Sequence, residues 1–159
     1  PGDGRTADYR EGVYVGYRWY DARRMPVLWP FGHGMGYTGF VYRNARLSAN
    51  TLAEGGEVKV CVTVKNSGAV RGAEVVQLYI SDETGAPIAG GRVPQVLRGF
   101  SKVWLDPGEE RDVEFVLTAR DLAYYDPTRR AWHTAPGRYL LRLGHTSRDI
   151  RASLGLNFG

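Results

Sequence analysis

Alternation of apolar and polar residues over residues 41–159 is the feature that most restricts how this chain can fold. It is clearest in the segment EVKVCVTVKNSG, where four valines at every second position, from Val58 to Val64, share one face of an extended chain. Lysines, a threonine and the single cysteine share the other face. Successive side chains of a strand point to opposite faces, so this pattern predicts a strand with one buried face.

Further strand-like segments follow, separated by turn sequences rich in Asn, Asp, Pro and Gly. They are GAEVVQLYISD, VLRGFSKVWL, EERDVEFVLT, RYLLRLGH and DIRASLGLNF, with DLAYYD and RAWHT on either side of a turn at Asp126-Pro127. The side chains expected to face inward are those of Val76, Leu78, Ile80, Val113, Phe115, Leu117, Tyr139, Leu141, Leu143, Ile150, Ala152, Leu154, Leu156 and Phe158. About seven short strands and no convincing helix predict an all-β chain, an immunoglobulin- or fibronectin type III-like antiparallel β-sandwich.

The lone cysteine, Cys61, excludes an intrachain disulfide and any cysteine-based zinc site. Its place in an alternating apolar run favours a packing role, and the missing cysteine pair argues against an antibody-type domain. The three histidines, His33, His133 and His145, lack the spacing of metal ligands. We therefore expect neither a metal nor a cofactor.

The net charge of +4 invites a nucleic-acid interpretation, but the charges are scattered. Only three of the 21 basic residues are lysines, and the longest basic runs are the pairs Arg23-Arg24 and Arg129-Arg130. Nucleic-acid binders gather their charge on one face, so we expect no nucleic-acid partner. With no apolar run of about 18 residues, we expect no membrane span either. The compartment is not indicated.

Residues 1–40 differ in composition and are here called the arm. Seven aromatic residues lie between Tyr14 and Tyr37, and the run GVYVGYRWYD reads as strand-like. The arm is too short and too rich in glycine to build a core, so it must either pack along the sandwich or dock on a domain outside this chain. The opening PGDGRTADYREG is no signal peptide and reads as the middle of a longer polypeptide.

The segment WPFGHGMGYTGF, residues 29–40, is here called the glycine-aromatic loop. It lacks the G-x-x-x-x-G-K-[ST] pattern of a P-loop, and no βαβ unit follows it as a dinucleotide site requires. Glycines allow positive φ and close backbone approach, and Pro30 stiffens the entry. We expect a tight bend that aromatic side chains fix in place, with the ring nitrogens of His33 in structural hydrogen bonds.

The arm and the segments after it resemble one known family. EGVYVGYRWYD followed by PVLWPFGHGMGYTGF is similar to the segment that leaves the α/β sandwich domain of family 3 glycoside hydrolases, the β-glucosidase type. The usual forms there are E-G-I-Y-V-G-Y-R-Y-Y-D and P-L-F-P-F-G-H-G-L-S-Y-T-x-F. VTVKNSGAVRGAEVVQLYISD, VPQVLRGFSKVWLDPGEERDVEFVLTARDLAYYD, WHTAPGRYLLRLG and SRDIR resemble that family's C-terminal fibronectin type III-like domain, in order. Trp19, Trp29 and Gly36 replace the usual Tyr, Phe and Ser.

The resemblance implies a parent enzyme that is a retaining glycosidase acting on β-linked glucosides, with its chemistry outside this chain. Retaining hydrolysis needs two carboxylates, and the family carries both in domains upstream of this segment. We assign no catalytic residue here. The acidic residues present fit solvated turns or strand edges: Glu54, Glu57, Asp82, Glu83, Glu109, Glu110, Asp121 and Asp126.

Two functions stay open: a non-catalytic C-terminal part that braces the catalytic domains, and an independent module that binds carbohydrate or protein. Tyr124, Tyr125 and Trp132 are the aromatics that could serve the second. The arm favours the first function, because a free module would not need it. Self-association through the arm is a further alternative. For His33, an accessory place near the sugar site is an alternative to its structural role. The residues expected to dock the arm on the upstream domains are Tyr14, Tyr17, Arg18, Trp19, Tyr20, Asp21, Pro30, Phe31, Gly32, His33, Gly34 and Tyr37. We expect Arg18 and Asp21 to form charge-assisted hydrogen bonds across that junction.

Overall fold

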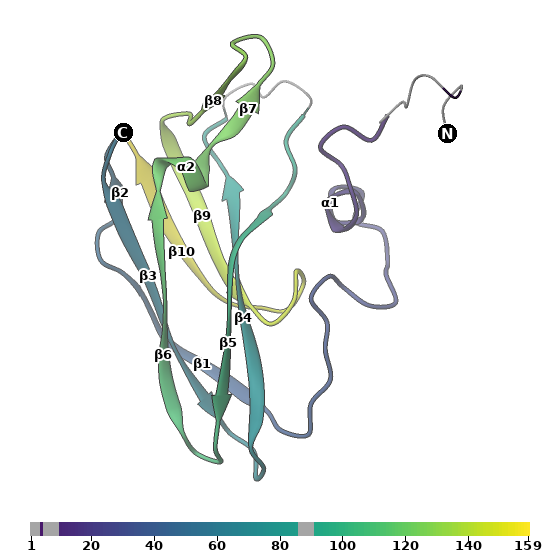
Figure 1. The fold of residues 1–159 in the computed structure, drawn as a ribbon, viewed down its shortest axis with the longest axis vertical. Helices are drawn as coiled ribbons and strands as arrows, with labels where there is room; N and C mark the ends of the chain where they lie inside the picture. Colours follow the sequence, from purple (N-terminus) through teal and green to yellow (C-terminus); the bar gives the residue numbers. More distant parts are fainter. Residues whose placement is uncertain (1–3, 5–9, 86–90) are drawn as a thin grey trace.

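Two facing β-sheets make up most of the chain in the computed structural model, which describes residue 4, residues 10–85 and residues 91–159 (Figure 1). The rest of the arm's first nine residues, and residues 86–90 of the loop after Asp82, lie outside the described residues. The first sheet has the order β1-β3-β6, with β1 at Phe40–Leu47, β3 at Glu57–Asn66 and β6 at Glu110–Thr118. The second has the order β2-β10-β9-β4-β5: Thr51–Leu52, Ile150–Phe158, Gly137–Gly144, Gly72–Asp82 and Val96–Leu105.

Pairing is antiparallel throughout both sheets, except that the two-residue strand β2 runs parallel to β10. A separate hairpin of β7, Tyr124–Asp126, and β8, Ala131–His133, closes around the predicted turn at Asp126-Pro127. The predicted all-β antiparallel sandwich is confirmed.

The hydrophobic core lies between the two sheets and is built from the side chains that alternation placed inward. All four valines from Val58 to Val64 are at most 1 % exposed. The remaining predicted inward residues belong to this cluster or pack against it half-buried, except Ile150, which is half-buried at the start of β10, and Cys61 is buried as well. The core cluster contains residues from Leu52 to Phe158 and none from the arm, so the two sheets bury one another without it.

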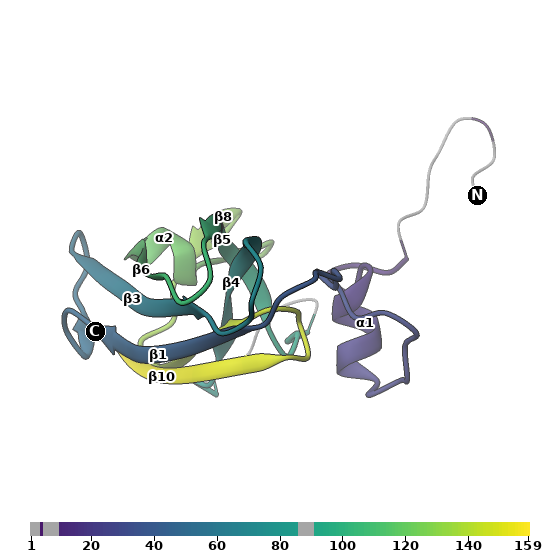
Figure 2. The same cartoon turned by 90° about the horizontal axis from the view of Figure 1, so that it is seen from below.

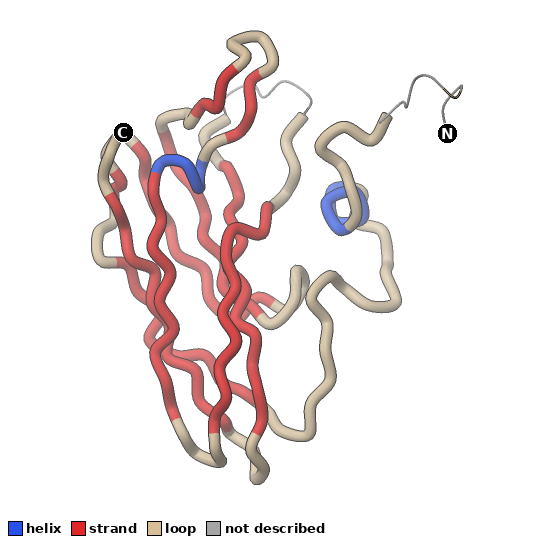
Figure 3. Tube along the Cα trace, in the orientation of Figure 1, coloured by secondary structure: helices blue, strands red, loops and turns tan. Residues whose placement is uncertain are grey.

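The chain contains two short helices, although the sequence predicted no convincing helix (Figure 3). The run predicted to be strand-like contains α1, Tyr17–Ala22, so that prediction was wrong. Its half-buried residues are 17, 18, 21 and 22, which lie on one side of a helix and would lie on both sides of a strand. The second helix, α2 at Ala119–Leu122, follows β6 directly. With six and four residues, neither helix of the described chain could cross a bilayer.

Several of the acidic residues expected in turns and at strand edges accept hydrogen bonds from backbone N–H groups there. Asp82 accepts from Thr84 N at 2.8 Å, and Asp126 accepts from Thr128 N at 2.8 Å. Asp121 closes the capping box of α2, with its carboxylate 2.8 Å from the N–H of Thr118. These carboxylates therefore shape the local backbone.

The arm lies beside the sandwich, on the side of β4 and β5, and the view from below shows α1 outside the space between the sheets (Figure 2). From α1 the chain returns through the glycine-aromatic loop to β1, which begins at Phe40. The arm thus contacts an outer face of the second sheet.

Candidate functional site: the arm and its junction with the sandwich

The outer face of β4 is covered where the arm crosses it. Gln77 and Tyr79 alternate with core residues and would face solvent in an isolated sandwich, yet they are 4 % and 0 % exposed. Tyr17 of α1 sits edge-on against Tyr79, and it stacks on Phe31 with ring centroids 4.7 Å apart. The arm therefore supplies a second, smaller apolar layer on the outside of the sheet.

Tyr17 also bonds to the neighbouring strand. Its hydroxyl accepts a hydrogen bond from the backbone N–H of Leu97, at 2.8 Å. Leu97 lies on β5, the edge strand of its sheet, next to an irregularity in the β4–β5 register. An edge strand leaves backbone N–H groups without strand partners, so the tyrosine hydroxyl satisfies one that the sheet does not.

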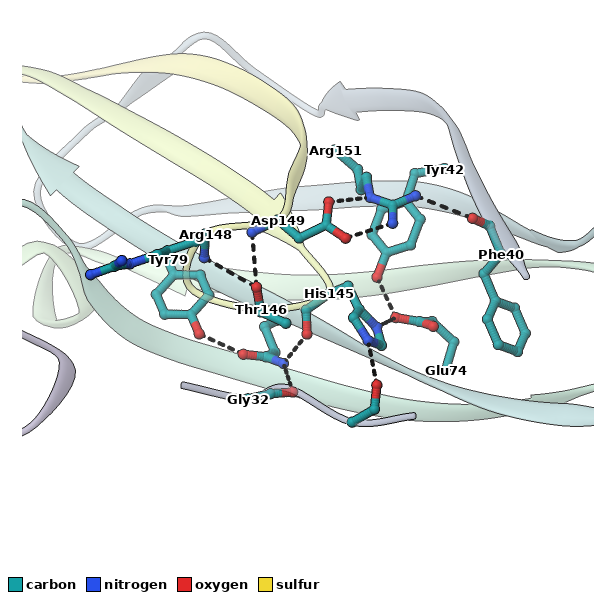
Figure 4. A network of polar contacts seen from close by, with 12 residues as sticks. Gly32, Phe40, Tyr42, Glu74, Tyr79, His145, Thr146, Arg148, Asp149 and Arg151 are labelled. Atoms are coloured by element: carbon teal, nitrogen blue, oxygen red, sulfur yellow. Dashed lines mark hydrogen bonds and ion pairs between the residues drawn. The ribbon is translucent and has the colours of Figure 1, made fainter. Parts of the chain in front are cut away.

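Gly32 lets the glycine-aromatic loop touch the sheet (Figure 4). The side-chain amide of Gln77 donates to the carbonyls of Gly32 and His145, and its oxygen accepts from the hydroxyl of Tyr79. Gly32 has φ +82°, and a Cβ atom there would overlap the Gln77 amide. Both the left-handed backbone and the close approach require glycine at this position.

A buried carboxylate on β4 forms the second polar contact. Glu74 is 2 % exposed and accepts a hydrogen bond from the hydroxyl of Tyr42 at 3.0 Å. His145, directly after β9, places Nδ1 2.6 Å from the same carboxylate and Nε2 3.3 Å from the carbonyl oxygen of Gly34 (Figure 4). Burial, followed by the negative charge and hydrogen bond of Glu74, raises the pKa of Tyr42. This phenol stays protonated and donates.

The loop between β9 and β10 holds the arm at a third point. Arg148 donates from Nε to Asp21 at 2.9 Å and from Nη2 to the carbonyl of Met25 at 2.9 Å. The backbone N–H of Ser147 donates to the carbonyl of Phe31, also at 2.9 Å. One short loop thus binds the end of α1 and the start of the glycine-aromatic loop together.

The other side of the arm exposes large apolar side chains. Leu28 is 84 % exposed, Trp29 60 % and Met35 88 %, and Tyr37 is fully exposed. A groove of about 490 Å³ runs between α1 and the segment 26–31, with Ser147 and Arg148 at its sandwich end. Exposed apolar groups this dense along one segment are typical of an interaction surface.

The predicted docking residues divide between these two sides. Those that contact the sandwich are Tyr14, Tyr17, Asp21, Gly32 and Gly34. Phe31 stacks on Tyr17 with one part of its ring surface and is 46 % exposed. Solvent-facing are Trp19, Tyr20, His33 and Tyr37, and half-buried are Arg18 and Pro30.

Two contacts differ in detail from what the sequence suggested. His33 stacks its ring on Trp29, with centroids 4.5 Å apart, and its bonded group among the described residues is the backbone N–H, which donates to Pro30 O. Asp21 makes its charge-assisted hydrogen bond inside this chain, to Arg148. No group of three or more His, Cys, Asp or Glu within the described ranges could hold a metal ion.

Several residues of the junction were not predicted from the sequence, among them the polar residues Tyr42, Glu74, His145 and Arg148. One signal was available, because Glu74 lies in phase with Val76 and Leu78, the inward residues of β4. A charged residue on the core side of a strand requires a partner, and here the partners are Tyr42 and His145. Nothing in the pattern indicated which residues these would be.

Comparisons with known proteins give a consistent result. Residues 74–147 match the model of the fibronectin type III-like domain. The chain is 41 % identical over 150 residues to thermostable β-glucosidase B of Acetivibrio thermocellus and 39 % identical over 158 residues to a β-glucosidase of Bacteroides ovatus. These matches cover 94 % and 99 % of the chain but 20 % and 21 % of the two enzymes, so the chain spans about one fifth of the length of these curated relatives.

Solved structures agree. The GH3 β-glucosidase of Bifidobacterium adolescentis superposes with a TM-score of 0.87 and 36 % identity, covering 99 % of this chain and 23 % of that one. The β-D-glucoside glucohydrolase of Trichoderma reesei also superposes with a TM-score of 0.87, at 33 % identity, covering 100 % of this chain and 24 % of that one. The likeness therefore includes the arm as well as the sandwich.

Proposed function

The chain carries a fibronectin type III-like domain and is homologous over most of its length to family 3 β-glucosidases, and we propose that it braces the catalytic domains of such an enzyme. It matches the C-terminal fibronectin type III-like part of those enzymes, which is consistent with a non-catalytic accessory domain. In this proposal the arm, residues 1–40, ends an upstream domain and links it to the sandwich, residues 41–159.

The exposed side of the arm is the observation that carries the proposal. Leu28, Trp29, Met35 and Tyr37 are largely exposed, while Tyr17 and Gly32 bond to the sandwich and Arg148 bonds to Asp21. Burying apolar surface contributes about 25 cal/mol per Å², so a domain that covers these four side chains gains affinity from a segment already held in position. The occupant we propose is the α/β domain upstream of the arm in the whole enzyme.

The reaction of the parent enzyme belongs to those upstream domains. Retaining hydrolysis of a β-glucoside requires a nucleophilic carboxylate and an acid/base carboxylate about 5–5.5 Å apart. In this chain Asp82, Asp121 and Asp126 bond to backbone N–H groups, and Glu74 is buried against His145. We infer that the β-linked glucoside binds and reacts elsewhere in the parent.

The alternative, an independent binding module, is not favoured. Its candidate residues on the β7–β8 hairpin do not form a flat row, because Tyr125 and Trp132 meet edge to face at 75°. The guanidinium of Arg120 lies 3.9 Å from the centre of the Trp132 ring. A platform for a sugar ring needs an accessible aromatic face, and the guanidinium of Arg120 covers one face of the Trp132 ring.

A chimera tests the proposed function. The matching fifth of the Acetivibrio enzyme is replaced by this chain, and Trp29→Ala with Tyr37→Ala is compared with Trp132→Ala, which removes a similarly exposed tryptophan from the sandwich. We expect the double variant to lower the melting temperature and the half-life of β-glucosidase activity, and Trp132→Ala to leave both near the parent values. Equal effects in the two variants would show that the arm's exposed side is not the docking surface.

A further inference from the structure

His145 lies between two hydrogen-bond acceptors. Its Nδ1 is 2.6 Å from the carboxylate of Glu74, and its Nε2 is 3.3 Å from the carbonyl oxygen of Gly34 (Figure 4). Neither an ionised carboxylate nor a carbonyl can donate, so each ring nitrogen must carry a hydrogen for both contacts to be hydrogen bonds. Neutral imidazole has one N–H and imidazolium has two. Both contacts are therefore hydrogen bonds together only when the ring is charged.

The surroundings favour the charged ring. Glu74 is 2 % exposed, and Tyr42 from β1 donates to it without bringing a charge. On the β10 side, Asp149 is already paired with Arg151, at 2.5 Å and 2.6 Å. A buried carboxylate without a cation is costly, and a protonated His145 provides that cation at contact distance.

Other titratable and charged groups line a second groove, which includes His145 and lies between the glycine-aromatic loop and β4. Arg71 precedes β4 and pairs with Asp106 at 3.4 Å. Lys102 of β5 lies over the ring of Trp104, 5.2 Å from its centre, and Tyr37 belongs to the loop itself. Among the described residues, His145 is the titratable group that contacts both the sandwich carboxylate and the loop backbone.

We propose that His145 fastens the glycine-aromatic loop to the sandwich only while its ring is protonated, so that the loop is released at Gly34 as the pH rises. In the neutral ring, the hydrogen remains on Nδ1, where the Glu74 carboxylate attracts it. The lone pair of Nε2 then faces the lone pairs of the Gly34 carbonyl, and this repulsion replaces the hydrogen bond. The contacts of Gly32 and Phe31 do not involve a titrating ring and persist.

The direction of the pH dependence follows from the pKa of His145. Burial lowers this pKa, but the hydrogen bond and the charge of Glu74, the carbonyl of Gly34 and the charge of Asp149 raise it, and the net result lies above the ordinary value of 6.5. A group whose pKa is raised by folding stabilises the folded arrangement fully below its unfolded pKa. That stabilisation is lost as the pH rises through the folded value. The release therefore occurs on the alkaline side of 6.5.

This inference concerns contacts within the chain and does not depend on what covers the exposed side of the arm. It goes beyond the proposed function, since a brace needs no titrating contact. If both hold, the position of Met35 and Tyr37 in the whole enzyme changes with pH as well.

Nuclear magnetic resonance of the isotope-labelled chain tests the proposal between pH 5 and 9. We expect the ring signals of His145 and the carbonyl and amide signals of Gly34 and Met35 to share one midpoint. That midpoint should lie above the midpoint of the same histidine in a peptide of residues 143–147. Backbone order parameters at Met35 and Tyr37 should fall above it, whereas the amide of Ser147, bonded to Phe31, should stay ordered.

Variants complete the test. His145→Gln keeps a side-chain donor but cannot titrate, so the pH dependence of the Gly34 signals should disappear. His133→Gln changes a histidine on the separate β7–β8 hairpin, and in this control the pH dependence of the Gly34 signals should remain. Three outcomes overturn the proposal. In the wild-type chain, the Gly34 signals change with pH at a midpoint different from that of the His145 ring; in His145→Gln, the Gly34 signals still change with pH; or the midpoint of His145 is not above that of the peptide. Should His145→Gln fail to fold, the shared midpoint in the wild-type chain decides alone.

Discussion

The ring of Tyr17 lies edge-on against the ring of Tyr79, with their centroids 6.0 Å apart and their planes at 77°. Tyr17 belongs to the arm and Tyr79 to β4, and the second tyrosine has no exposed surface. This pair is the centre of the contact between arm and sandwich, because Phe31 stacks on one of its members and Gln77 bonds to the other. The arm therefore packs against the sandwich through this pair and leaves other apolar side chains exposed.

Removing the hydroxyl of Tyr17 should loosen the edge of β5. In Tyr17→Phe the N–H of Leu97 loses its acceptor, which corresponds to about 0.5–1.5 kcal/mol of local stability. Hydrogen exchange at Leu97 should accelerate accordingly. Tyr125→Phe, which changes a half-exposed ring on β7, should leave this rate unchanged. An unaltered Leu97 amide in Tyr17→Phe would contradict the assigned bond.

Substitution of Gly32 should detach the glycine-aromatic loop. Gly32→Ala puts a side chain at φ +82°, which costs about 1–2 kcal/mol, and displaces the Gln77 amide from its bonds to Tyr79 and the loop. Urea unfolding should show the loss, and the amide of Ser147 should become less protected. Gly36→Ala is the matched control, since a Cβ there meets ordinary space and no positive φ is required. Similar losses in both variants would refute the special role of Gly32.

Deletion of the arm should leave a folded sandwich. A chain of residues 40–159, which lacks the arm except Phe40, keeps the entire core cluster and the Phe40 ring that packs against it, so urea should still unfold it in one cooperative step. Tyr79 and Gln77 become exposed, so we expect lower stability and a near-ultraviolet circular dichroism signal changed by the new environment of Tyr79. A truncated chain that is insoluble or unfolds without cooperativity would mean that the arm belongs to the core.

The chain alone should not hydrolyse aryl β-glucosides. The two carboxylates that retaining hydrolysis requires are expected in the upstream domains, and in this chain Asp82 and Asp121 bond to backbone N–H groups while Glu74 bonds to His145. The purified chain should release no nitrophenol from 4-nitrophenyl β-glucoside. Turnover that disappears when an acidic residue of 41–159 is changed would prove the assignment wrong.

The strands could be predicted because the alternation of apolar and polar residues within each strand shows which of its faces is buried. Val58 to Val64 and Leu141 to Leu143 alternate with polar residues, and burial of one face against a second sheet follows from a period of two. The register and the partner strands did not follow from any single segment. The ordered set of motifs from Glu11 to Phe158 is enough to indicate the family, since several motifs in sequence order are far more specific than one.

The helix at Tyr17–Ala22 could not be predicted from its own residues. The run GVYVGYRWYD is rich in β-branched and aromatic residues, which favour strands, but its hydrogen-bond partners and its burial come from β4, β5 and the β9–β10 loop. As a helix, residues 17–22 pair their backbone groups within the segment, and Tyr17 and Asp21, four residues apart, face the sandwich together.

By itself the sequence determined the two-sheet core, because alternation and local turn chemistry are properties of consecutive residues. It also indicated the family, through the order of its motifs. Only the tertiary structure decided that Gln77 and Tyr79 are covered and that Glu74 meets His145, 71 positions along the chain. The physical reason is that a period of two tells which side of a strand each residue occupies. It does not tell what lies on that side, and a hydrogen bond depends on the positions of both partners to a fraction of an ångström.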